Sequence, residues 1–186
     1  MLFRSEWHAE AGRRGLLNLK TTLDALDTLV SEKNITLFEK YSVLSEAELR
    51  SREEIWVEQY FLTINIEAEM TESLARTMVM PAASSYLSSL VQTIEQGNSV
   101  GVSTTGVKQV ADHVAAYIDE LQEALSELID NNKDLGGESV HDKALHMLNT
   151  VIPSMNKVRH ATDRLERITS ADLWPLPTYR DMLFVK

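Results

Sequence analysis

From Ser45 the chain runs to Pro81 without a glycine or a proline. Such a stretch of roughly 35 residues is far longer than an ordinary β-strand, although the inner segment "IWVEQYFLTINI" partly alternates in the manner of one. Ser45 and Glu48 have the spacing of a capping box, the side-chain pair that closes the first turn of a helix. The sequence therefore predicts a long helix that begins after Ser45 and reaches Pro81.

Apolar side chains occupy nearly every side of the first half of this predicted helix. They are Ile55, Trp56, Val57, Tyr60, Phe61, Leu62, Ile64 and Ile66. A helix that is apolar all round is usually buried by neighbours on several sides. We therefore expect this helix to be central in the fold.

Two further segments, 107–129 and 140–168, repeat apolar residues at steps of three and four, the period of an amphipathic helix. Ser139 stands before the second segment, with Asp142 three residues later, as in an N-cap. The polar, glycine-containing stretch "NNKDLGGES" separates the two segments. The pattern predicts two antiparallel helices joined by a turn.

Two prolines interrupt the predicted long helices. Pro81 and Pro153 each remove a backbone donor, so we expect kinks near both. The predicted fold is all-α, a long-helix antiparallel bundle with short N-terminal helices and an irregular apolar C-terminal tail. The predicted division is a junction of short helices at 1–44, the bundle at 45–171 and a docking tail at 172–186.

The formal net charge of -10 is concentrated in the middle of the chain. Residues 45–97 carry three basic and nine acidic side chains, and residues 98–138 carry two and eight. Such a surface repels phosphate backbones, so we expect no nucleic-acid partner. No window is apolar enough to span a membrane or to act as a signal peptide, and there is no cysteine. We therefore expect no membrane partner and a cytoplasmic location.

The five histidines are scattered, and none lies three or four residues from another in the way that places two metal ligands on one helix face. They are His8, His113, His141, His146 and His160. Glu54 and Glu58 are four residues apart and raise the alternative of a carboxylate di-metal bundle. That class uses Glu-x-x-His pairs on two helices, whereas the sequence has one such pair, Glu138 and His141, at a turn. We predict no metal-ligating residue.

No arrangement for nucleophilic catalysis or phosphate binding is present in the sequence either. There is no G-x-S-x-G motif and no cysteine. The glycine-rich stretch "GNSVGVSTTG" precedes a predicted helix, but no strand leads into it and it has no lysine of the phosphate-loop type. We predict no catalytic and no cofactor-binding residue.

The last fifteen residues, "DLWPLPTYRDMLFVK", are unusually apolar for a chain end. Pro175 and Pro177 end the last helix, while Trp174 and Leu176 can still pack against a surface. The residues alone favour packing on the chain's own bundle, and they leave open a separate partner.

Four segments closely resemble the C-terminal region of type III glutamine synthetases. They are "RRGLLNLKTTLDAL", "FEKYSVLSEAELRSREEIWVEQYFLTINIEAEM", "ARTMVMPAA" and the terminal "DLWPLPTYRDMLFVK". The resemblance covers residues 13–186 in the family's order. It implies an all-helical C-terminal domain, whose packing partner is the catalytic domain of the same polypeptide family.

The resemblance also implies a parent reaction, the ATP-dependent ligation of ammonia to glutamate, with Mg or Mn held in a β-rich catalytic core. No position here matches the motifs of that core, so no site residue can be carried over. The expected role is a structural and assembly domain, without chemistry of its own, within a homo-oligomeric enzyme of nitrogen metabolism. Two alternatives stay open, a free-standing helical interaction module and, more weakly, the carboxylate di-metal enzyme.

Overall fold

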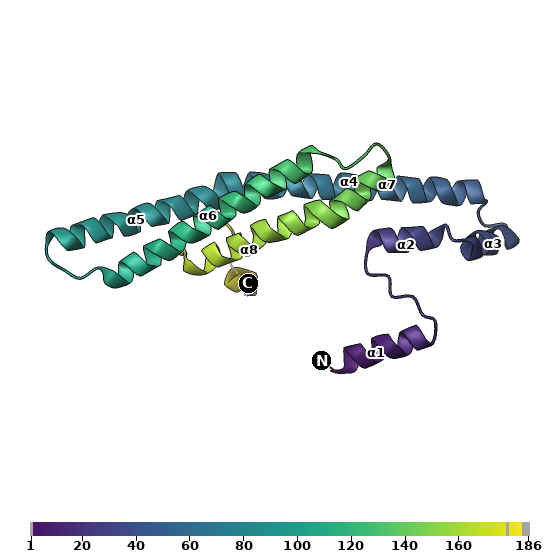
Figure 1. The fold of residues 1–186 in the computed structure, drawn as a ribbon, viewed down its shortest axis with the longest axis horizontal. Helices are drawn as coiled ribbons and strands as arrows, with labels where there is room; N and C mark the ends of the chain where they lie inside the picture. The colour runs from purple at the N-terminus through teal and green to yellow at the C-terminus, as the bar shows by residue number, and fades with distance from the viewer. Residues whose placement is uncertain (1, 178, 184–186) are drawn as a thin grey trace. The chain divides into compact units, whose positions relative to one another are not determined.

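The structure is a computed structural model that describes residues 2–177 and 179–183, and its regular elements are all helical (Figure 1). These elements are α1 (Leu2–Arg13), α2 (Thr22–Leu29), α3 (Glu32–Lys40), α4 (Glu46–Leu74), η1 (Ala75–Val79), α5 (Met80–Ser99), α6 (Thr105–Lys133), α7 (Val140–His146), η2 (Met147–Val151), α8 (Ile152–Ile168) and α9 (Tyr179–Leu183). The predicted all-α fold is confirmed. None of the described helices is long and apolar enough to cross a membrane.

The chain divides into two compact units. The first contains residues 1–62 and 138–145, and the second contains residues 63–137 and 146–186. Helix α4 is continuous through the boundary between them. The boundaries of these units differ from the predicted boundaries at residues 44 and 171. The predicted division into domains stays a prediction.

In the first unit, α2, the first half of α4 and α7 contribute the buried apolar residues. Leu23 and Leu26 of α2, Leu49 and Val57 of α4, and Ala144 of α7 are each at most 9% exposed. Leu23 and Leu26 are three residues apart, and Leu49 and Val57 are eight apart, so each pair lies on one side of its helix. One apolar side of each helix therefore faces inward.

The predicted capping box at the start of α4 is confirmed. The Glu48 carboxylate accepts hydrogen bonds from the Ser45 backbone N–H and hydroxyl, both at 2.8 Å. The Glu48 backbone N–H in turn points at Ser45 Oγ, 3.4 Å away. The box satisfies backbone donors that would otherwise lack a partner at the helix start, and it explains why α4 begins where it does.

Replacing Ser45 with alanine removes its hydroxyl and keeps its backbone N–H, so it should raise the pKa of Glu48 part of the way toward its ordinary value. The Ser45 backbone N–H, followed by the Ser45 hydroxyl, holds the pKa of this carboxyl below that value. A pKa that is lower in the folded state means that the interaction stabilises above the unfolded pKa, and that this stabilisation is lost as pH falls through the folded pKa. NMR titration of the Glu48 carboxyl checks the shift. Ser51→Ala, in the same helix but outside the box, should leave the pKa of Glu48 lowered. An unchanged Glu48 pKa in Ser45→Ala would contradict the capping box.

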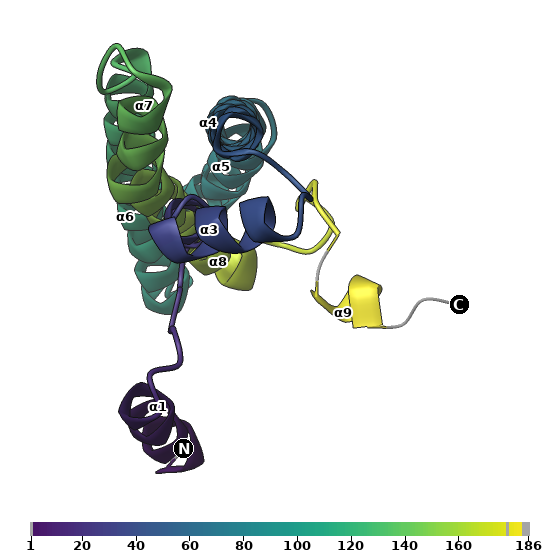
Figure 2. The same cartoon turned by 90° about the vertical axis from the view of Figure 1, so that its right-hand side faces the viewer.

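In the second unit, α6 contacts both α5 and α8, and Figures 1 and 2 show the three helices as neighbours. The buried residues of α6, from Ala111 to Leu128, have helical spacings such as three, four and seven residues and therefore lie on one side of the helix. They pack with the buried side of α8, which includes Val158, Ala161 and Leu165. Helices α6 and α8 run in opposite directions (Figure 1). The predicted antiparallel helix pair is confirmed.

Pro81 and Pro153 each follow a five-residue π-helical segment. Segment η1 ends two residues before Pro81, and η2 ends two residues before Pro153. In η1 the Met80 backbone N–H donates to the Ala75 carbonyl, five residues back, and in η2 Ile152 donates to Met147 in the same way. Because proline has no N–H, the helix around it loses a bond of the ordinary four-residue type, and a local π segment is one way in which helices absorb such an interruption. The prolines therefore interrupt α-helical geometry without ending the helical path.

The turn after α6 is stabilised by contacts at Gly136. This residue has a φ of +80°, and its N–H donates to Asp134 Oδ1 at 3.0 Å. His146 lies against Gly136, and its Nε2 is 2.7 Å from the carbonyl oxygen of Asn131 near the end of α6. The turn thus combines a left-handed backbone conformation with a close side-chain neighbour, and both conditions favour glycine.

Candidate functional site

Helix α4 exposes most of its large apolar side chains, so the expectation of a central helix is wrong for the described chain. Only Leu49, Val57 and Ala68 of α4 are buried in the described residues. The large apolar residues with 38–59% exposure are Ile55, Trp56, Leu62, Ile66, Met70 and Leu74. The physical reason is that the chain's own helices do not supply enough neighbours to surround a helix that is apolar all round.

Within the second unit, three of these residues form what we call the α4 stripe: Ile66, Met70 and Leu74. They are spaced by four residues, which places them on one side of the helix, and they are 59%, 52% and 38% exposed. Burying one such side chain completely is worth about 1.5–3 kcal/mol. A connected row of exposed apolar side chains is typical of a surface that contacts another protein part.

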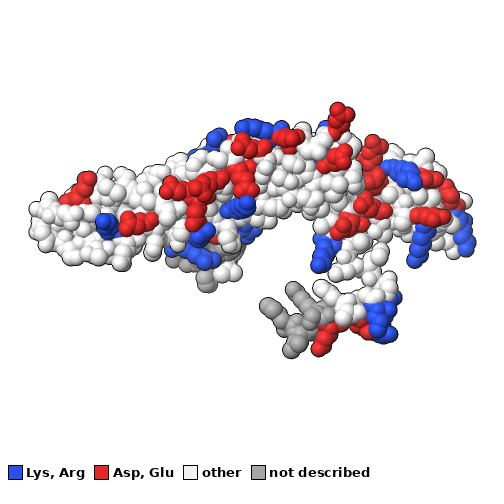
Figure 3. Space-filling model, viewed as in Figure 1, with Lys and Arg blue, Asp and Glu red and all other residues white. Residues whose placement is uncertain are grey.

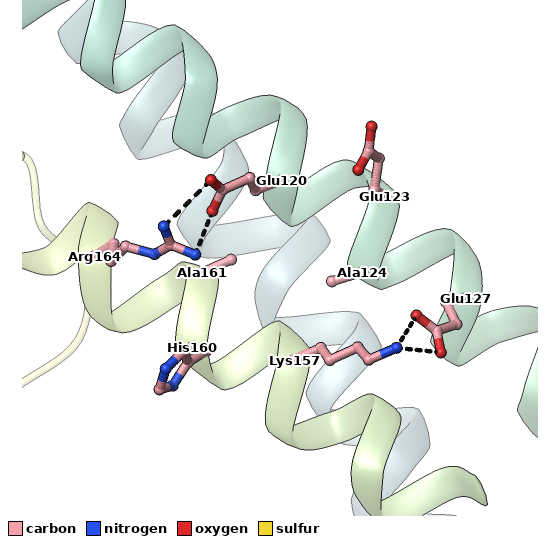
Figure 4. Close-up of a pocket in the computed structure, with 8 residues that line it drawn as sticks. All are labelled: Glu120, Glu123, Ala124, Glu127, Lys157, His160, Ala161 and Arg164. Carbon is pink, nitrogen blue, oxygen red and sulfur yellow. Dashed lines mark hydrogen bonds and ion pairs between the residues drawn. The ribbon is translucent and has the colours of Figure 1, made fainter.

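A second feature of this unit is a polar groove between α6 and α8 (Figure 4). Lys157 Nζ lies 2.7 Å from both carboxylate oxygens of Glu127. Arg164 Nη1 donates to Glu120 Oε1 at 3.2 Å, and its guanidinium carbon lies 5.2 Å from the centre of the Tyr117 ring. Each of these two cations is therefore matched by a carboxylate on the facing helix.

These pairs tie α6 to α8 more than they form a site for a charged ligand. All four side chains are 40–57% exposed, and exposed ion pairs are worth at most about 1 kcal/mol each. Acidic and basic side chains also lie close together over the face drawn in Figure 3. The ion pairs therefore link the exposed edges of α6 and α8.

The carboxylates that raised the di-metal alternative do not come together with histidines in the arrangement of that class. Glu54 and Glu58 are exposed on α4, and Glu138 is exposed before α7. His113 is exposed and stacks on Tyr117, with ring centres 6.4 Å apart. The neighbour that the structure places beside His141 is Glu53, a residue that no sequence pattern marked. The expectation that the chain holds no catalytic residue stays a prediction.

The glycine-rich stretch near residue 100 differs from a phosphate-binding loop in its surroundings. Residues 100–104 connect α5 to α6, so the loop joins two helices, whereas a phosphate-binding loop follows a strand and carries a lysine toward the phosphates. Val100 and Val102 are 74% and 60% exposed in this loop. The expectation of no cofactor-binding residue in this loop stays a prediction.

The apolar tail is partly packed. Trp174 is 9% exposed, and its backbone N–H donates to the Ser170 carbonyl at 3.1 Å in the turn that follows α8. Met182 and Leu183 of α9 are 55% and 79% exposed. Residues 178 and 184–186 of the predicted docking tail lie outside the described residues. Within the described part of the tail, the buried residue Trp174 therefore places the packing near its beginning.

Comparison with known proteins gives consistent matches. A family model described as the glutamine synthetase C-terminal domain matches residues 3–98. The type-3 glutamine synthetase of Dictyostelium discoideum is 34% identical over 99% of this chain, and the glutamine synthetases of Bacteroides fragilis (strain YCH46) and Butyrivibrio fibrisolvens are 26% and 29% identical over 99% and 98% of it. In each case the match covers 26% of the relative. The chain thus spans about a quarter of the length of the curated relatives it matches.

Proposed function

Because the chain belongs to the glutamine synthetase C-terminal domain family, we propose that it is the helical structural and assembly domain of a type III glutamine synthetase, without an active site of its own. The relative named as a type-3 enzyme aligns over almost the whole chain, which supports the type. The parent reaction in this proposal is the ATP-dependent ligation of ammonia to glutamate. ATP and Mg or Mn belong to the catalytic part of the enzyme.

The α4 stripe is the observation that carries this proposal. It leaves Ile66, Met70 and Leu74 exposed, and it lies within the family-matched residues 3–98. The relatives are about four times as long as the aligned segment, so they contain a large additional part that could cover such a surface. The proposed occupant of the stripe is the catalytic domain of the same polypeptide family.

Assembly as a homo-oligomer and a cytoplasmic location complete the proposal. Most of the exposed large apolar side chains lie in the family-matched residues, which supports contacts beyond the described chain. Oligomeric enzymes bury such surfaces between copies as well as between domains.

The test supplies the chain in trans to a relative that lacks it. The Dictyostelium discoideum enzyme is produced without the stretch aligned to this chain and is co-expressed with this chain, which carries an affinity tag. We expect the two to co-purify. The double variant Ile66→Glu and Met70→Glu should reduce the recovered partner at least ~10-fold, because each change places a charge in an apolar contact.

Two controls make the result decisive. The relative's own excised stretch, supplied in trans, shows that the truncated enzyme is competent to bind. Gln122→Glu and Ser126→Glu, two exposed positions on α6 with the same spacing and the same added charge, should leave the complex intact. Because the stripe is exposed, its double variant should keep the helical circular dichroism spectrum of the chain. Self-association through the stripe without binding to the truncated enzyme would contradict the proposal and favour a free-standing interaction module.

A further inference from the structure

Three metal-ligating side chains from separate segments converge in the first unit. Asp27 is in α2, Glu53 is in α4 and His141 is in the first turn of α7. One ligand atom of each, two carboxylate oxygens and one imidazole nitrogen, lie within 4.8 Å of one another. The first and last of these residues are more than a hundred positions apart in the sequence, so only the fold brings them together.

Each of the three residues stands next to a buried residue of its own helix. Asp27 follows Leu23 by four residues, Glu53 lies four residues from both Leu49 and Val57, and Ala144 comes three residues after His141. Residues at these spacings share a helix side. The buried apolar residues therefore fix the backbone positions from which the three polar side chains meet at the edge of the core.

The three groups are also not engaged elsewhere. Within the described part of the chain, the side chains of Asp27, Glu53 and His141 make no ion pair or hydrogen bond with another side chain or with the backbone. Arg50, which lines the cavity beside Glu53 and His141, is paired with Glu46 at 2.8 Å. Among the described residues, no lysine or arginine forms an ion pair with either carboxylate, and two carboxylates held close together repel each other unless a cation lies between them.

We propose that Asp27, Glu53 and His141 form a three-ligand site for a divalent cation of the zinc class. Nitrogen and oxygen ligands at about 2.0–2.2 Å suit Zn²⁺, and three protein ligands leave a fourth position for water. In that geometry the ligand atoms are about 3.3 Å apart, so binding draws the present cluster inward through side-chain rotation. Asp27 is exposed and has room for that movement.

Such an ion would join α2 to α4 and α7, and it would neutralise the carboxylate pair. It would hold together three segments that otherwise meet through a small set of buried apolar residues. The site is separate from the α4 stripe in its residues and in its role, so it does not depend on the function proposed above.

Titration of the metal-free chain with Co²⁺, followed by displacement with Zn²⁺, tests this proposal. We expect one Co²⁺ per chain with the strong visible absorption of a four-coordinate site, loss of that spectrum on adding Zn²⁺, and a higher thermal midpoint with Zn²⁺. His141→Ala should weaken Co²⁺ binding at least ~10-fold, since loss of a direct ligand costs no less than loss of a group that only orients one. Asp27→Asn and Glu53→Gln should also weaken it.

Matched variants separate this site from weak binding at other side chains. His160→Ala removes an exposed histidine of α8, and Glu54→Gln removes the carboxylate next to Glu53. Both should leave Co²⁺ affinity and the spectrum unchanged. Equal affinities in His141→Ala and the unmodified chain would overturn the proposal, as would Mg²⁺ that competes as well as Zn²⁺, because a nitrogen ligand disfavours Mg²⁺.

Discussion

Replacing Leu121 with alanine is expected to lower the free energy of unfolding by about 2–5 kcal/mol. Leu121 lies near the middle of α6 and is 0% exposed. Its truncation removes apolar contacts and leaves a cavity in the packed interior of the second unit, where α6 contacts both α5 and α8. Urea denaturation followed by circular dichroism measures the change.

The control for this substitution is Leu74→Ala. Leu74 is the same residue type in the same unit, but it is 38% exposed at the end of the α4 stripe. Its truncation should cost less than about 1 kcal/mol, because part of its surface is already in water. If the two variants lost equal stability, the assignment of α6 as the packed centre of this unit would be wrong.

Replacing Gly136 with alanine should destabilise the turn that follows α6. The φ of +80° is strained for any residue with a side chain, at a cost of about 1–3 kcal/mol. An added Cβ would also overlap Cβ and Cγ of His146. Displacing His146 would further lengthen the contact between its Nε2 and the Asn131 carbonyl. We expect a lower thermal midpoint and a change in the His146 imidazole signals by NMR.

Gly106→Ala should act in the opposite direction. Gly106 is in the first turn of α6 without a positive φ, and an added Cβ would meet nothing within 4 Å. Alanine at such a position stabilises by about 0.4–1 kcal/mol, mainly because it restricts the unfolded chain. A loss of stability in Gly106→Ala that matched Gly136→Ala would show that the turn conformation is not the cause.

Much of the fold could be predicted from local signals. The capping residues Ser45 and Ser139 mark the starts of α4 and α7, and the glycine-containing turns mark the ends of α5 and α6. These signals act within a few residues, so periodicity and punctuation are sufficient to read them.

The surroundings of α4 could not be predicted in the same way. The positions of its apolar residues show that they occupy nearly every side of the helix. This pattern does not say whether the residues that cover them belong to this chain. Val57 is buried and its neighbour Trp56 is 43% exposed. That difference is decided by tertiary contacts, which a single sequence does not contain.

The cluster of Asp27, Glu53 and His141 escaped prediction for a related reason. Helical spacing can identify ligands on one helix, whereas these three residues come from three helices. The nearest sequence signal was the pair Glu138 and His141. It contains the histidine of the cluster, but the carboxylates of the cluster are Asp27 and Glu53. Long-range convergence of this kind becomes visible only when the helices are placed.

The π-helical segments have a consequence for the phase of the long helices. A π segment accommodates about one extra residue within its turn, and one residue corresponds to a rotation of about 100° around the axis. The side of α4 that carries Ile66 and Met70 therefore continues into a different side of α5 than it would along an uninterrupted α-helix. Segment η1 thus changes the phase of one continuous helical path. In sequence, its buried residues Ala75 and Val79 separate the exposed α4 stripe from the α5 helix that contacts α6.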